Sequence, residues 1–110
     1  MNDRELLELA AKATGITLEW DGNPEEWIPM YYEGKTYHSW NPLDDDGDAM
    51  RLAVKLRLMI AWDRWNDNDY VCIRHRDLDE EIGIQIDQRP EQTVRRAIVR
   101  AAAAIGRAME

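Results

Sequence analysis

Four carboxylates stand close together in the run Asp44-Asp45-Asp46-Gly47-Asp48, a composition that could suit a divalent cation. An EF-hand loop, however, spaces its ligands at alternate positions and closes with a glutamate about six residues after its glycine. Here the carboxylates are contiguous, and Ala53 stands where that glutamate belongs. The run directly precedes an apolar helical pattern, where aspartate oxygens accept the first unpaired N–H groups of a helix. The sequence therefore predicts helix capping at this run and no metal site.

Catalytic residue types are sparse in this chain. His38 and His75 are the only histidines, and neither has a second histidine or cysteine at zinc-ligand spacing. The segment Arg74-His75-Arg76-Asp77 could place a general base beside a carboxylate, but a histidine between arginines at a strand end is more often simply exposed. Cys72 stands in an apolar strand pattern and fits a small buried hydrophobe. We therefore expect no enzyme activity, no catalytic residue and no cofactor.

Aromatic side chains are the more informative group. All five tryptophans and four tyrosines lie in two regions, residues 20–40 and 62–70. Tryptophan and tyrosine are favoured as anchors of protein interfaces and as platforms for nucleobase stacking. Because the chain has no phenylalanine, tryptophan could also serve as core filler. We expect a part of the aromatic set to be exposed, with Trp27, Tyr31 and Trp65 as anchors for a partner.

Three helices and six strands are predicted to position these residues. Asn2 caps and Gly15 ends a first helix, Ala49, Leu52, Ala53 and Leu56 give a second one its apolar stripe, and Pro90 opens a third that runs to about Met109. Alternating patterns predict strands at 16–21, 27–32, 35–40, 58–63, 70–76 and 82–87. Pro29 cannot donate a ladder hydrogen bond, so its strand is expected at a sheet edge or at a bulge.

The predicted order is α-β-β-β-α-β-β-β-α within one α+β domain spanning residues 1–110. Hairpin-length connections predict a mostly antiparallel sheet of five or six strands, with the three helices packed on one face. The scheme of a helix followed by three strands occurs twice, although we find no matching residues between the two halves. With 45% apolar residues, the chain can form one continuous core without disulfides or metal.

The charge is strongly asymmetric along the chain. Residues 1–50 carry 12 carboxylates against three cations, whereas residues 51–110 are nearly neutral, and the net charge is −8. An acidic half would repel a phosphate backbone, so we expect no direct contact with nucleic acid. It would suit a partner with a basic surface, although acidity also serves solubility. A stripe of arginines in the last helix could pair with the acidic half of a second copy and give a homodimer; it comprises Arg95, Arg96, Arg100 and Arg107.

Two segments resemble a family of small, mostly uncharacterised proteins encoded by phages and prophages of Gram-negative bacteria. They are WNPLDDDGDAMRLAVKL at residues 40–56 and RRAIVRAAAAIGRAM at residues 95–109. The resemblance covers 32 of the 110 residues and carries no catalytic motif. It implies a setting: an accessory protein acting in the cytoplasm of an infected bacterium. The absence of an apolar signal segment or of a run of about 20 apolar residues agrees with that location and with no membrane contact.

Two functions are argued from these features, and a third, a structural or regulatory phage protein with no defence role, stays open. The first is a non-enzymatic phage protein that binds and inhibits a host protein with a basic surface, an anti-CRISPR-like inhibitor of antiphage defence. Its contact residues would be Trp27, Tyr31 and Trp65 together with Asp44, Asp45 and Asp46. The second is a small-ligand binder that sequesters a nucleotide signal of host defence, using stacked tryptophans and the arginines Arg74, Arg76 and Arg96.

Overall fold

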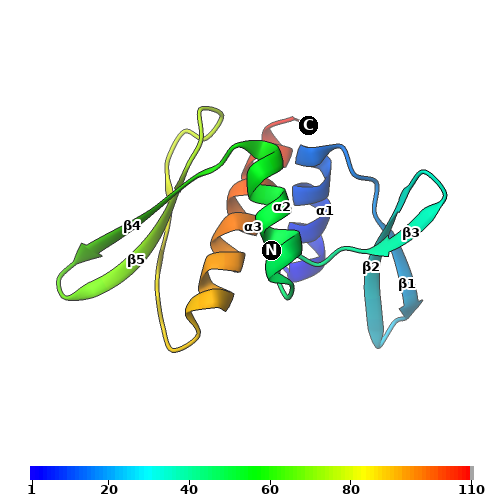
Figure 1. Cartoon of the computed structure of the whole chain (residues 1–110), viewed down its shortest axis with the longest axis horizontal. Coiled ribbons are helices and arrows are strands. Elements are labelled where there is room, and N and C mark those ends of the chain that lie inside the picture. The colour runs from blue at the N-terminus through cyan, green and yellow to red at the C-terminus, as the bar shows by residue number, and fades with distance from the viewer. Residues whose placement is uncertain (110) are drawn as a thin grey trace.

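A layer of three helices separates two small antiparallel sheets in the computed structural model, which describes residues 1–109 (Figure 1). The first sheet has the order β1-β2-β3 and the second the order β4-β5-β6. The bounds are α1 Asp3–Thr14, β1 Glu19–Asn23, β2 Glu26–Glu33, β3 Thr36–Ser39, α2 Asp46–Leu56, β4 Met59–Trp65, β5 Asn68–Arg74, β6 Ile82–Gln85 and α3 Pro90–Ala108. The α+β class and the predicted order of elements are confirmed.

The expected single sheet is wrong, because β3 and β4 are not hydrogen-bonded to each other and both lie at sheet edges. After β3 the chain turns through Asn41 and Leu43 into α2, where Asn41 accepts the amide of Asp44 and so begins the turn. The chain then crosses the helix layer before β4 begins. As a result the helices do not cover one face of a continuous sheet. They form a middle layer with one sheet on each side (Figure 1).

Pro29 lies in the central strand β2, so its expected position at an edge or bulge is also wrong. The carbonyl oxygen of Pro29 accepts the amide of Trp40 at 2.9 Å. A strand residue directs its backbone nitrogen and carbonyl toward the same neighbour. The missing donor of Pro29 therefore faces the position just beyond Ser39, where β3 has ended, and no ladder hydrogen bond is lost.

The three helices run parallel. Asp3 at the start of α1 pairs with Arg96 near the start of α3, and Leu9 lies against Gly106 near the end of α3. At the start of α2, Asp46 pairs with Arg95 of α3 at 2.6 Å. All three N-termini therefore lie at one end of the layer and all three C-termini at the other. Acidic side chains occupy the first turn of each helix, where they meet the positive ends of the helix dipoles; these are Asp3, Glu5, Asp46, Asp48 and Glu91.

The capping predictions are confirmed in detail. The side chain of Asn2 accepts the amide of Glu5 at 2.8 Å, and Asp45 accepts that of Asp48 at 2.8 Å. Gly15 ends α1 in the left-handed conformation, with φ of 83°. These contacts satisfy backbone groups that have no partner inside the helix.

The two halves of the chain share their helix ends and edge strands. Arg57 ends α2 with φ of 58°, in the same left-handed conformation as Gly15, and each cap makes the same two backbone hydrogen bonds to the preceding turn. In the outer strands, Asp21 and Asp63 each accept the amide of the next residue at 2.8 Å. The α-β-β-β scheme therefore occurs twice with matching helix ends and outer-strand contacts, and α3 has no counterpart.

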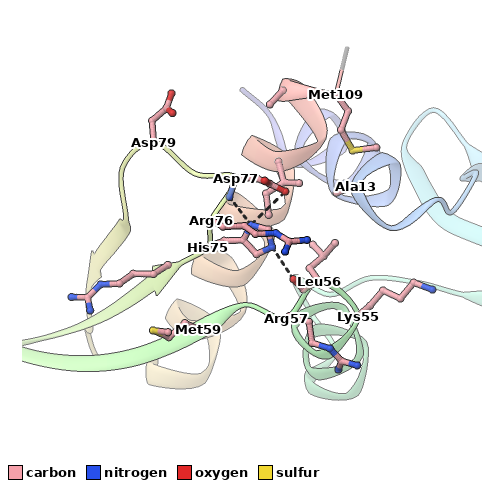
Figure 2. Close-up of a pocket in the computed structure, with 13 residues that line it drawn as sticks. Ala13, Lys55, Leu56, Arg57, Met59, His75, Arg76, Asp77, Asp79 and Met109 are labelled. Carbon is pink, nitrogen blue, oxygen red and sulfur yellow. Dashed lines mark hydrogen bonds and ion pairs between the residues drawn. The ribbon is translucent and has the colours of Figure 1, made fainter.

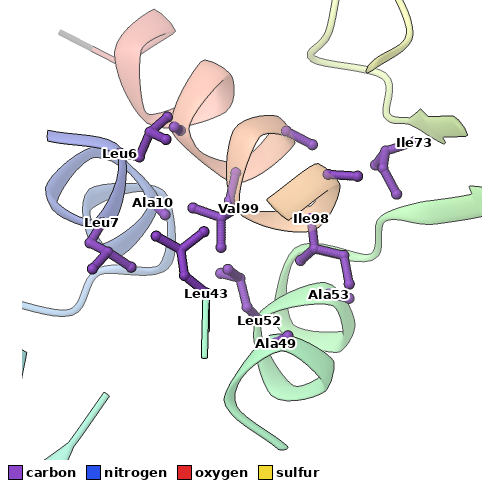
Figure 3. Packing of buried hydrophobic residues seen from close by; sticks show 14 of the residues in the cluster. Leu6, Leu7, Ala10, Leu43, Ala49, Leu52, Ala53, Ile73, Ile98 and Val99 are labelled. Atoms are coloured by element: carbon purple, nitrogen blue, oxygen red, sulfur yellow. The ribbon is translucent and has the colours of Figure 1, made fainter. Parts of the chain in front are cut away.

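The core lies between the helices and the inner face of the second sheet (Figure 3). Leu52 of α2, Val99 of α3 and Ile73 of β5 are almost completely buried, and each contributes about 1.5–3 kcal/mol by leaving water. The alanine block of α3 and Gly106 allow α1 to approach closely. A Cβ atom on Gly106 would overlap the carbonyl oxygen of Leu9.

Cys72 is buried although its side chain belongs to the outer face of the second sheet. It stands opposite Ala61 and Gly83, two small residues. Burial, followed by the negative charges of Glu81 and Asp63, raises the pKa of the Cys72 thiol. The cysteine therefore behaves as the small hydrophobe expected from the sequence.

Candidate functional site

The outer face of the first sheet gathers aromatic and acidic side chains in the open. Strand pairing sets Glu19 opposite Met30, Asp21 opposite Ile28 and Tyr32 opposite Tyr37, and directly opposite residues share a face. We call this surface the acidic sheet face and define it by Glu19, Asp21, Ile28, Met30, Tyr32 and Tyr37. Tyr32 is 60% exposed, and Ile28 and Tyr37 are exposed as well.

The alternate residues of the same strands explain why this face is turned outward. Trp20 donates its indole N–H to Glu8 of α1 at 3.0 Å, and Pro29 and Trp40 are buried. The guanidinium of Arg4 lies 4.7 Å from the ring centroid of Trp20. Since side chains of a strand alternate between its two faces, the other set must face solvent.

The acids of this face lie close to one of its aromatic rings. Partial desolvation, followed by the negative charges of Asp21 and Glu19, raises the pKa of Tyr37 above its ordinary value. The ring centroids of Tyr32 and Tyr37 lie 4.6 Å apart. Residues 16–50, which include this sheet, carry nine carboxylates and Lys35 as the one cation. The surface is therefore negative and partly apolar.

The anchors predicted from the sequence do not come together. Trp27 is 40% exposed on the inner side of the first sheet, with the Arg4 guanidinium 5.5 Å from its ring centroid. Tyr31 is half-buried on the same side and packs against His38. Trp65 is 66% exposed but ends β4 in the second sheet, across the helix layer. The prediction that some indoles are exposed holds for three of five tryptophans, because Trp62 is exposed too.

The predicted acidic contacts, Asp44 to Asp46, lie at the start of α2 rather than on the acidic sheet face. Asp44 accepts the side-chain amide of Asn41 at 3.1 Å, Asp45 caps the helix, and Asp46 pairs with Arg95. Their charges are thus partly used inside the chain. Arg95 and Arg96 pair with Asp46 and Asp3 of their own chain, so these two arginines are not available for the pairing expected between two copies.

Arg74 and Arg76 both line a cleft of about 1140 Å³ at the C-terminal ends of the helices. Figure 2 shows Arg76 among the residues around it. We call it the C-terminal cleft; its charged lining is Lys55, Arg57, Arg74, Arg76, Asp77 and Asp79, with His75 between them. Arg96 lies elsewhere, near the opposite end of α3, and the lining contains no tryptophan. The cleft therefore brings together two of the three predicted ligand-binding arginines without the stacking rings.

His75, directly after β5, is hydrogen-bonded to the end of α2 and to the loop that follows β5. Its Nε2 lies 2.9 Å from the carbonyl oxygen of Leu56, and its Nδ1 accepts the amide of Asp77 at 3.0 Å (Figure 2). These partners assign the proton to Nε2, which donates to one of the unpaired carbonyls at the end of α2. Both ring nitrogens are occupied by backbone groups, which favours an anchoring role for His75.

Comparison with family models, curated proteins and solved structures finds no match to this chain. Among residues 1–109, no helix is both long and apolar enough to cross a bilayer, and no group of three metal-ligating side chains occurs.

Sequence reasoning missed the acidic sheet face as a site. The alternation of Ile28, Met30 and Tyr32 is visible in the sequence, and so is that of Glu19 and Asp21. The register between β1 and β2 brings these two sets of residues onto one face, and the Gly22-Asn23-Pro24 turn alone does not specify that register. Lys55 and Arg57 were missed because their proximity to Arg76 arises only when the end of α2 meets the segment after β5, where His75 contacts Leu56.

Proposed function

We propose that this protein is a non-catalytic binding protein that docks the acidic sheet face onto a basic surface of another protein. In the setting implied by the phage resemblance, the target is a host protein, a component of antiphage defence that is inhibited by binding. The observation that carries the proposal is the exposure of Tyr32, Tyr37 and Ile28 beside Glu19 and Asp21.

Physical reasons favour a protein partner with cations. Tyrosine supplies a large contact area at low entropic cost, and such rings often dominate binding energy. Carboxylates around them steer a basic partner and repel acidic ones, including nucleic acid. Compared with the anchors proposed from the sequence, this surface moves the contact from Trp27 and Tyr31 to the opposite side of the same sheet.

The test uses affinity capture from host lysate followed by titration of the captured protein. Glu19→Lys should abolish capture, whereas Glu80→Lys, the same charge reversal at an exposed position of the second half, should not. Replacing both Tyr32 and Tyr37 by alanine should weaken binding by about 2 kcal/mol or more. Affinity should fall by roughly tenfold or more as NaCl rises from about 0.1 M to about 0.5 M. A captured protein that Glu19→Lys retains at both salt concentrations contradicts the proposal.

A second candidate is an anionic small ligand, such as a nucleotide signal, in the C-terminal cleft. Lys55 and Arg76 form no ion pair with another residue of the described chain, which is the observation in its favour. Against it, Asp77 and Asp79 and three helix C-termini offset these cations. A panel of cyclic nucleotides should raise the melting temperature only if this candidate holds, and Arg76→Ala should remove the effect.

A further inference from the structure

Exposed apolar side chains gather on two consecutive elements on the side of the molecule away from the first sheet. Met50 and Val54 stand one helical turn apart on α2, and Met59, Trp62 and Trp65 follow on β4, with Trp62 66% exposed. A groove of about 400 Å³ joins the two elements; its apolar lining is Ala49, Met50, Trp62, Val94 and Ile98. By strand alternation Trp62 lies on the inner face beside this groove, whereas Met59 and Trp65 lie on the outer face, so apolar side chains are exposed on both faces of β4. Exposed apolar side chains gathered in this way mark an interaction site.

The backbone of β4 is unpaired on its outer side. β4 is the outer strand in the order β4-β5-β6. The carbonyl of Asp69 in β5 accepts the amide of Ile86, so the backbone groups of Asp69 face β6. Its partner Arg64 must then direct its own groups away from β5, as must Ile60 and Trp62 at alternate positions. An edge with free donors and acceptors beside an apolar groove is suited to take up another strand.

We propose that β4 pairs antiparallel with β4 of a second copy, forming a homodimer with Trp62 on the two-fold axis. β4 spans Met59–Trp65, so pairing over its full length places Trp62 opposite Trp62, Met59 opposite Trp65 and Ile60 opposite Arg64. If the two-fold axis is perpendicular to the sheet, even-numbered residues of one β4 must face even-numbered residues of the other, and odd must face odd. The helices of both copies then lie on the same face of the joined sheet. The register centred on Trp62 has this pairing.

Charge and shape also fit a second copy. No like charges stand directly opposite each other in this register, since Asp63 meets Ala61 and Arg64 meets Ile60. The second Trp62 lies on the inner face beside the groove, where Met50 and Val94 can cover it. A six-stranded sheet continuous across the two copies results.

Asp63 opposes this association in the single chain. Its carboxylate accepts the amide of Arg64 at 2.8 Å and thereby occupies one of the edge donors that the second strand needs. Such charged side chains are a known means by which edge strands limit pairing. The dimer is therefore reversible, and removing the carboxylate should strengthen it. This inference is independent of the proposed function, because the acidic sheet face lies across the helix layer and stays open.

The first experiment measures molar mass by light scattering over a range of protein concentrations. The wild-type protein should approach twice 12.9 kDa at high concentration. Trp62→Lys and Met50→Lys should keep their circular dichroism spectra and remain monomeric. Tyr32→Lys, a matched control on the first sheet, should dimerise like the wild type, and Asp63→Ala should lower the dissociation constant by about tenfold. A wild-type protein that stays monomeric at millimolar concentration, or a dimer that persists in Trp62→Lys, overturns the proposal.

The second experiment tests the register by oxidation in a Cys72→Ala background. Trp62→Cys should form a disulfide-linked dimer rapidly, because the two positions face each other on the axis. Trp65→Cys should not, because it faces Met59 of the other copy, whereas the double variant with Met59→Cys should cross-link. Equal cross-linking of Trp65→Cys and Trp62→Cys would refute the register, and failure of the double variant Met59→Cys with Trp65→Cys, which keeps Trp62, would exclude it as well.

Discussion

Asp48 is the buried carboxylate around which the start of α2 is organised. It accepts the amide of Asn41 at 2.9 Å and the guanidinium of Arg51 at 2.7 Å, while its own amide is held by Asp45. The side chain of Asp48 is 12% exposed and that of Arg51 is 71% exposed. The structural role therefore rests on the backbone contact to Asn41 more than on the ion pair, which water screens.

Replacing Asp48 by alanine should lower the free energy of unfolding by about 1–3 kcal/mol, because the Asn41 amide loses its acceptor. Asp44→Ala, at an exposed neighbour, should change it by about 0.5 kcal/mol or less. Urea denaturation of the two variants measures the difference. Equal effects would show that the run acts through general charge.

Asp87 performs the capping function at the start of α3 that Arg89, the residue at the cap position, does not. Its Oδ1 accepts the amide of Arg89 at 2.8 Å and the hydroxyl of Thr93 at 3.1 Å. The Arg89 amide first, and then the Thr93 hydroxyl, lower the pKa of Asp87 below its ordinary value of 3.8. The stabilisation is thus complete above that value and is lost as the pH falls through the lower pKa of the folded state.

The unfolding free energies of the wild type and of Asp87→Asn should therefore differ most above pH 4 and converge in stronger acid. Guanidinium denaturation from neutral pH to about pH 2 follows this convergence. A difference that is constant with pH would mean that the charge of Asp87 does not contribute.

At the scale of elements, the packing of α1 on α3 depends on the absence of a side chain at Gly106. Gly106→Ala should lower the free energy of unfolding by about 2 kcal/mol or more, although alanine is the better helix former by about 1 kcal/mol. Gly83→Ala is the control, since its Cβ would meet only the Sγ of Cys72 at 3.9 Å and should cost less than about 1 kcal/mol. Thermal unfolding compares the two.

Local signals in the sequence predicted the elements well because each has its own chemistry. Asn2, Asp45 and Pro90 begin helices, Gly15 ends one, and clear alternation marks β6 at Ile82 and Ile84. The pairing of strands between the two halves of the chain was not predictable from such local signals. Nothing between Ser39 and Met59 states whether β3 and β4 pair, and the same hairpins could form one sheet or two. For the same reason the sequence could not show which aromatic residues share a surface, and Trp27 and Trp65 lie in different sheets.

At the scale of the whole molecule, the two sheets differ in how firmly they are attached. The only buried strand residue of the first sheet is Pro29, whereas in β5 Val71 and Ile73 are buried in the core with the helices and Cys72 is buried on the outer face. Sheets with little buried surface open locally, without unfolding of the rest. The surface proposed for partner binding thus belongs to the less firmly attached half.

Amide hydrogen exchange should show this difference directly. Amides of β5 should exchange only with global unfolding, and those of β2 at least about 100-fold faster, through local opening. Destabilising the core with Gly106→Ala should accelerate β5 and leave β2 nearly unchanged. Uniform protection across both sheets would contradict this arrangement.

The position of the single cysteine makes its modification rate a probe of unfolding in one half of the protein only. Cys72 lies in the second sheet and the first sheet has none, so alkylation by a maleimide registers exposure of one half only. In the native protein the rate of Cys72 modification would then report unfolding of the helix layer with β4–β6. Opening of β1–β3 alone would leave this rate unchanged.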